Sequence, residues 1–149
     1  APQATAFVRV SAFGESRDNG TPLQTNDTDL QELQAGTDAP LGGGALVVTG
    51  NTSALRGKPN FAGFAPTKAA QRILTESIAR DLGPQGVHVA YLVIDAVIDV
   101  PWARQRFKDA SDDFFIKPAA IAEEIHHIAH QDRSAWSFLS EVRPYRESW

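Results

Sequence analysis

Apolar residues between positions 45 and 94 follow two different patterns, continuous runs and a spacing of three to four residues. Ala45–Gly50 and Val87–Ile94 are almost continuous apolar runs, a pattern typical of strands that are covered on both faces of a sheet. From about Phe64 to Leu82, apolar side chains recur at intervals of three and four, which predicts a helix with one apolar stripe. Pro66 is tolerated in the first turn of this helix, and the Gly-Pro pair at 83–84 ends it. The predicted stripe consists of Ile73, Leu74, Ile78 and Leu82.

A second helix and a last strand are predicted towards the end of the chain. A polar crossover at about 100–110 is followed by a helix over Pro118–His130, with proline at its start, and by a strand candidate over Ala135–Arg143. A strand, a helix and a second buried strand in succession indicate a right-handed βαβ unit in a parallel sheet. We therefore expect a three-layer α/β/α Rossmann-like parallel sheet, with all 149 residues in one domain.

Residues 1–44 are poorly specified by comparison. They contain one short strand candidate at Ala6–Val10 and one short helix candidate at Asp29–Ala35, which Gly36 would end. The segments around them are rich in Gly, Asn, Asp and Thr, which is typical of loops and turns. We therefore expect the sheet to be truncated or compressed in its N-terminal half.

Composition excludes several classes of function. A net charge of −4 argues against a broad phosphate-binding surface, so we expect no nucleic acid partner. The absence of cysteine excludes disulfides, thiolate nucleophiles and cysteine-ligated metals, and it is compatible with the cytoplasm, where we place the protein. No apolar run approaches the roughly 20 residues that span a bilayer.

The strongest motif in the chain joins these predicted elements. The segments GGGALVVTGNTSALRG and FAGFAPTKAAQRILTESIARDLGPQGVHVAYLVIDAVIDVP, with the tail KPAAIAEEIHHIAHQDRSAWSFLSEVRP, resemble the C-terminal half of a short-chain dehydrogenase/reductase. The resemblance covers roughly 105 residues, from Gly43 to the end. In that family a serine stands near the end of the strand before the catalytic loop, and a Tyr-x-x-x-Lys lies on the next helix. The following strand leads into a Pro-Gly turn over the nicotinamide.

This chain departs from the family pattern at most of the catalytic positions. Phe64 stands where the family has its tyrosine, and a phenylalanine has no hydroxyl with which to pass a proton. Asn51 stands at the serine position with Thr52 and Ser53 beside it, and any of the three could polarise a substrate carbonyl. Lys68 is kept, and the resemblance implies that it contacts the nicotinamide ribose. An ion-paired surface lysine and a core aromatic are the alternative interpretations of Lys68 and Phe64.

The same resemblance implies NAD or NADP as the cofactor. It places Lys68, Asp95 and Val97 at the cofactor, with Val100 in place of a threonine that touches the carboxamide. The glycine-rich turn that receives the pyrophosphate is not recognisable. The segment VVTGNTSALRG looks like it, but Ala54 and Arg56 stand at two of the glycine positions, and the spacing to Phe64 and Lys68 identifies it as the later strand. We therefore expect that this chain alone does not bind a dinucleotide at micromolar affinity.

Two clusters have further interpretations. His126 and His130 share a helix face, but nothing in the sequence completes a metal site, so we expect no metal. Aromatic and apolar residues near the end of the chain are expected to cover the sheet edge or an interface. These residues are Trp136, Phe138, Val142 and Tyr145.

Three functions remain open from the sequence. The first is an NAD(P)-dependent oxidoreductase with impaired activity on a carbonyl or alcohol substrate. The second is a catalytically silent relative that serves as an assembly module. The third is a protein that binds a small ligand, without cofactor, in the cleft where the family binds its substrate. In each case we expect a homo-oligomer that forms through the helix at 61–82, the sheet edge, or both.

Overall fold

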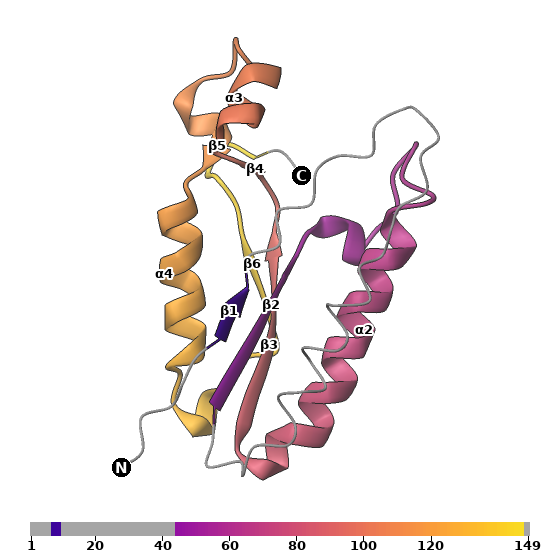
Figure 1. Ribbon diagram of the computed structural model, residues 1–149, viewed down its shortest axis with the longest axis vertical. Coiled ribbons are helices and arrows are strands. Elements are labelled where there is room, and N and C mark those ends of the chain that lie inside the picture. Colours follow the sequence, from indigo (N-terminus) through magenta and orange to yellow (C-terminus); the bar gives the residue numbers. More distant parts are fainter. Residues whose placement is uncertain (1–6, 10–43, 148–149) are drawn as a thin grey trace.

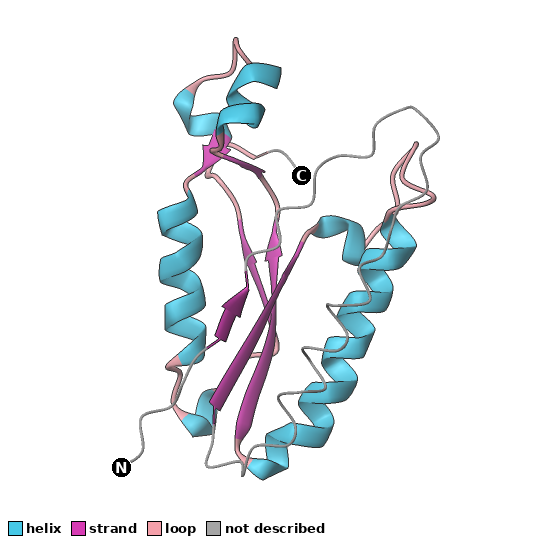
Figure 2. Cartoon of the chain, in the orientation of Figure 1, coloured by secondary structure: helices cyan, strands magenta, loops and turns pink. Residues whose placement is uncertain are grey.

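The computed structural model describes residues 7–9 and 44–147, which form a parallel sheet between two helices (Figure 1). The strands are β1 (Phe7–Arg9), β2 (Gly44–Gly50), β3 (Val87–Ile94) and β6 (Leu139–Val142). They lie in the order β1-β2-β3-β6, and all neighbouring pairs are parallel. Helix α2 (Ala65–Leu82) covers one face and α4 (Pro118–Ala129) covers the other (Figures 1 and 2). The predicted three-layer α/β/α arrangement is therefore confirmed.

The strong sequence signals locate the element ends well. The predicted strand at 87–94 matches β3 at both ends, and the helix predicted from about Phe64 matches α2 to within one residue. The helix predicted from Pro118 ends at Ala129, one residue earlier than expected. β1 falls within the predicted strand at 6–10, whereas the helix predicted at 29–35 lies outside the described residues.

The strand predicted at Ala135–Arg143 is longer than the observed strand β6. Only Leu139–Val142 pairs with β3, because a short 3-10 helix, η4 (Arg133–Ala135), takes up the start of the predicted range. Trp136 then stacks on His88, with ring centroids 4.8 Å apart. Phe138 and Val142 pack against the two sides of the core, as expected of residues that cover the sheet.

The segment between β3 and α4 contains more structure than the predicted crossover. A short α-helix, α3, spans Pro101–Arg106, and a 3-10 helix, η3, spans Asp112–Phe114; a further 3-10 helix, η2 (Gly83–Gln85), lies before β3. β4 (Val97–Ile98) and β5 (Phe115–Ile116) form a separate two-stranded parallel sheet above the main one (Figure 1). Strands of two residues leave no periodicity in the sequence, which is why the pattern did not predict them.

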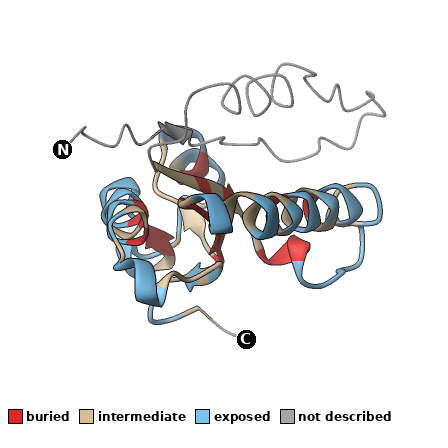
Figure 3. Ribbon diagram, turned by 90° about the horizontal axis from the view of Figure 1, so that it is seen from below, coloured by how far each residue is buried: buried red, intermediate tan, exposed pale blue. Residues whose placement is uncertain are grey.

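β3 is the centre of the core, since all eight of its residues are buried (Figure 3). Its alternate side chains point to opposite faces, as the pleat of a strand requires. Ala90, Leu92 and Ile94 pack against Ile125 and Ile128 of α4, together with other apolar residues. Burying one such isoleucine stabilises the fold by about 1.5–3 kcal/mol.

The predicted apolar stripe of α2 is wrong for two of its four residues. Ile73 is 51% exposed and Leu74 is 41% exposed, whereas Ile78 and Leu82 are half-buried. The buried residues of the helix are Lys68 and Thr75. The sheet-facing side can be polar because its groups find partners locally. Thr75 Oγ1 donates to Gln71 O at 2.8 Å, and Arg72 Nε donates to the backbone oxygen of Ala54 at 3.3 Å. No helix in the described part of the chain is long and apolar enough to cross a membrane.

Candidate functional site

The predicted site residues follow the carboxyl ends of neighbouring parallel strands. β2 ends at Gly50 and is followed by Asn51, while β3 ends at Ile94 and is followed by Asp95. Asp95 N donates to the backbone oxygen of Val142 at 2.9 Å, which ties this position to the end of β6. In parallel α/β sheets, ligands bind at this edge, outside the carboxyl ends of the strands.

The loop after β2 turns immediately into a 3-10 helix, η1 (Thr52–Ala54). Asn51 caps this helix, because its side-chain oxygen accepts a hydrogen bond from Ser53 N at 3.0 Å. Thr52 and Ser53 are buried at 7% and 5% exposure. The cap assigns the oxygen of Asn51 a structural task, which leaves its amide nitrogen as the group that could polarise a carbonyl.

Phe64 and Lys68 lie at the start of α2. Phe64 is the residue before the helix, is half-buried, and packs edge-on against Phe61 with ring centroids 5.9 Å apart. Lys68 is only 7% exposed, and its Nζ lies 6.0 Å from the centroid of the Phe64 ring. Burial lowers the pKa of the Lys68 ammonium below the ordinary lysine value. A cation therefore stands next to an apolar ring that has no hydroxyl.

Lys68 is connected to β3 through a glutamine. Lys68 Nζ donates to Gln71 Oε1 at 3.2 Å, and the Tyr91 hydroxyl donates to the same oxygen at 3.4 Å. Tyr91 is completely buried, and burial raises its pKa to about 12. Gly50 lies against the Tyr91 ring, because a Cβ at Gly50 would lie 2.6 Å from Tyr91 Cε1 and closer still to its hydroxyl. The sequence patterns did not single out Gln71, Tyr91 or Gly50.

Asp95 faces an arginine that the sequence analysis did not assign to the site. Arg56 Nη2 lies 3.9 Å from Asp95 Oδ2, and that carboxylate oxygen is buried without a hydrogen bond in the described structure. Val97 is part of β4 and pairs with Phe115, and Val100 immediately precedes α3. Asp95, Val97 and Val100 thus lie where the chain passes from the main sheet to the small one, whereas Lys68 lies on α2. No sequence signal links Arg56 to Asp95, since they lie 39 positions apart on different elements.

The histidine pair on α4 forms no metal centre that the described residues can complete. The rings of His126 and His130 stack with centroids 4.0 Å apart, and His130 Nδ1 is hydrogen-bonded to the backbone oxygen of His126 at 2.7 Å. Within residues 7–9 and 44–147, no group of three histidine or carboxylate side chains could hold a metal ion.

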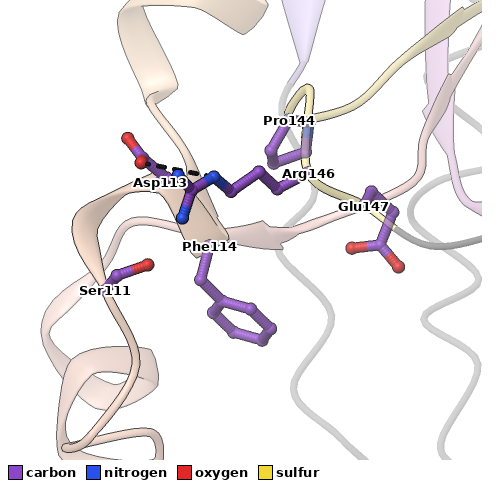
Figure 4. Close-up of a pocket in the computed structure, with 6 residues that line it drawn as sticks. All are labelled: Ser111, Asp113, Phe114, Pro144, Arg146 and Glu147. Carbon is purple, nitrogen blue, oxygen red and sulfur yellow. Dashed lines mark ion pairs between the residues drawn. The ribbon is translucent and has the colours of Figure 1, made fainter.

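Two hollows lie beside the C-terminal segment of the described chain. One has a volume of about 120 Å³ (Figure 4), and its neighbour has about 380 Å³. Asp113 ties their walls together, because its carboxylate accepts from the Tyr145 hydroxyl at 3.0 Å and lies 3.8 Å from Arg146 Nε. None of the predicted site residues lines either hollow. The first is lined by Ser111, Asp113, Phe114, Pro144, Arg146 and Glu147.

The sheet order, the two covering helices and the site at the carboxyl edge define a Rossmann-like α/β protein. Comparison with solved structures is more specific. A short-chain dehydrogenase from Rhodopseudomonas palustris is 38% identical over 70% of this chain and 40% of its own, with a TM-score of 0.53. No family model matches the sequence.

Two more distant structures show the same fold. An NADPH-bound short chain oxidoreductase from Pseudomonas aeruginosa PAO1, with an atypical catalytic center, is 18% identical over 70% of this chain and 46% of its own (TM-score 0.58). An actinorhodin polyketide ketoreductase with NADPH is 18% identical over 78% of this chain and 52% of its own (TM-score 0.61). The chain therefore has the fold of the short-chain dehydrogenase/reductase family, and it spans about half the length of these structures or less.

Proposed function

We propose that residues 45–149 form the nicotinamide- and substrate-facing half of an NAD(P)-dependent oxidoreductase site whose proton transfer is impaired. The observation that carries this proposal is Lys68, a buried lysine on the helix after β2, four residues beyond the position of the family tyrosine. Burying an ammonium costs free energy unless it is hydrogen-bonded, and Gln71 supplies one acceptor for Lys68. In the proposed site Lys68 holds the nicotinamide ribose.

The roles of the other residues follow from their chemistry. The amide nitrogen of Asn51 and the hydroxyl of Thr52 would donate to a substrate carbonyl oxygen. Asp95 and Val97 would lie beside the carboxamide of the nicotinamide. Phe64 supplies no proton to an alkoxide that forms after hydride transfer, so the reaction lacks its usual general acid. We therefore expect oxidoreduction of a carbonyl or alcohol to be slow.

Titration with NADH and NADPH, followed by ligand-detected NMR up to millimolar concentration, tests this function. We expect binding weaker than about 10 µM, a binding free energy of about −7 kcal/mol, because the pyrophosphate turn is unrecognisable. Lys68→Ala should weaken it further, while Lys58→Ala, ten positions earlier on an exposed loop, should not. Absence of binding by the folded chain, or equal binding by Lys68→Ala, would overturn the proposal.

A second candidate function is that of a catalytically silent assembly module. Ile73 and Leu74 favour it, because two large apolar side chains on the outer side of α2 are half exposed. Such residues contribute to association when they meet a second apolar surface. This function predicts an oligomer without any binding of dinucleotide, which separates it from the first in the same titration.

A further inference from the structure

The side of α2 that faces the sheet contains a polar chain that the proposed roles do not use. Lys68, Gln71 and Thr75 are spaced by three and four residues, so they lie on one side of the helix. Thr75 satisfies its own hydroxyl with the backbone oxygen of Gln71. Gln71 reaches in two directions at once, since its Oε1 lies 3.2 Å from Lys68 Nζ and 3.4 Å from the Tyr91 hydroxyl.

The chemistry of the three groups allows only one orientation of this amide. A carboxamide oxygen has two lone pairs and can accept from two donors, whereas its nitrogen only donates. If the Gln71 amide were turned over, its NH₂ would face an ammonium that can only donate, and a buried acceptor would be lost. Tyr91 stays protonated at neutral pH, because burial holds its pKa at about 12, so it donates to the same oxygen.

Tyr91, which holds Gln71, is itself held by a contact with β2. Tyr91 extends from β3 and is completely buried, and its ring occupies the space next to Gly50 that any larger residue would fill. The ring therefore has close neighbours both at Gly50 and at Gln71. Four residues from β2, β3 and α2 form one connected contact path, which ends at the Lys68 ammonium. The path is Gly50, Tyr91, Gln71 and Lys68.

We infer that Gln71 is a positioning residue, which Tyr91 holds in place and which in turn orients the Lys68 ammonium towards the carboxyl edge of the sheet. The hydrogen bond to Gln71 also favours the charged form of Lys68, against the effect of burial. The significance of this arrangement for cofactor binding rests on the function proposed above. The hydrogen-bonded support itself does not depend on that function.

The direct test is an NMR titration of the lysine Nζ groups in the full chain, which contains four lysines: Lys58, Lys68, Lys108 and Lys117. Gln71→Leu should lower the pKa of Lys68, because burial remains while the acceptor is lost. Gln71→Glu keeps an acceptor oxygen and adds a negative charge, so it should raise the same pKa. Gln85→Leu is the control, since Gln85 is an exposed glutamine whose amide nitrogen donates to the backbone oxygen of Asp81 at 3.1 Å.

The outcomes are distinct. Shifts of Lys68 in opposite directions in the two Gln71 variants, larger than the scatter among the other three lysines, support the inference. An unchanged Lys68 titration in either folded variant overturns it. If Gln71→Leu fails to fold, Gln71→Met takes its place, because it also removes the acceptor, adds no charge and keeps an unbranched side chain.

Dinucleotide affinity is the second readout. If the wild-type chain binds NAD(P)H, Gln71→Leu should weaken binding about tenfold, the effect of losing one hydrogen bond to a charged group. An unchanged affinity together with an altered lysine titration would refute the orienting role. If the wild type binds no dinucleotide, the proposed function fails, and the lysine titration still decides whether Gln71 holds Lys68.

Discussion

Gly50→Ala is the substitution whose effect follows most directly from the geometry. The new Cβ would lie 2.6 Å from Tyr91 Cε1 and closer to the end of the ring, which is far inside van der Waals contact. Tyr91 is completely buried in the centre of the sheet, and its hydroxyl is bonded to Gln71, so the ring cannot move without breaking contacts. Overpacking of this kind costs about 1–3 kcal/mol. We expect a value near the upper end, because the clash is with a packed aromatic ring.

Urea unfolding, followed by circular dichroism, measures this cost. Gly44→Ala is the matched control, since Gly44 lies on the same strand and a Cβ there would meet nothing within 4 Å. The control should be neutral or slightly stabilising, by about 0.4–1 kcal/mol. In the double variant Gly50→Ala/Tyr91→Ala, the penalty for adding the methyl group should largely disappear. Equal stability of Gly50→Ala and Gly44→Ala would refute the packing argument.

Three further predictions concern chemistry, titration and assembly. Phe64→Tyr should not by itself create robust activity, because the pyrophosphate turn is still unrecognisable; NADPH-dependent ketone reduction at about 1 s⁻¹ or faster would contradict this. An ultraviolet titration should show the Tyr91 phenol ionising at about 12 instead of 10.0, and stability should fall with pH between these values, since the folded state holds the proton more tightly. Light scattering should show a homodimer or a larger oligomer. Ile73→Glu should disrupt it if α2 is the interface, and Leu139→Glu should disrupt it if the β6 edge is the interface. A 16.1 kDa monomer would show that neither surface associates.

The elements with strong local signals could be predicted from the sequence. β3 is buried on both faces, so a continuous apolar run was the correct signal, and its ends coincide with the prediction. α2 and α4 each have proline in the first turn, which marks their starts because proline fits there without the loss of a hydrogen bond. The motif around Lys68 then predicted the family fold, which the comparison with solved structures confirms.

The composition of the candidate site was only partly predictable. Lys68, Phe64 and Asn51 could be named because their spacing along the chain matches a known motif. Arg56, Gln71 and Tyr91 could not, because each enters the site through a contact between different elements or through the side that α2 turns to the sheet. Whether these residues serve a cofactor stays a prediction.

Sequence periodicity determines that α2 is a helix, but the tertiary structure decides which side of it is buried. A spacing of four links Leu74, Ile78 and Leu82, and a spacing of three and four links Lys68, Gln71, Thr75 and Ile78. The period alone therefore does not decide whether Leu74 or Thr75 faces the sheet. The choice depends on β3, where the Tyr91 hydroxyl offers Gln71 a second partner besides Lys68 of the same helix. The free energy of burying a polar group depends on its partners, and those partners are brought together only when the chain has folded.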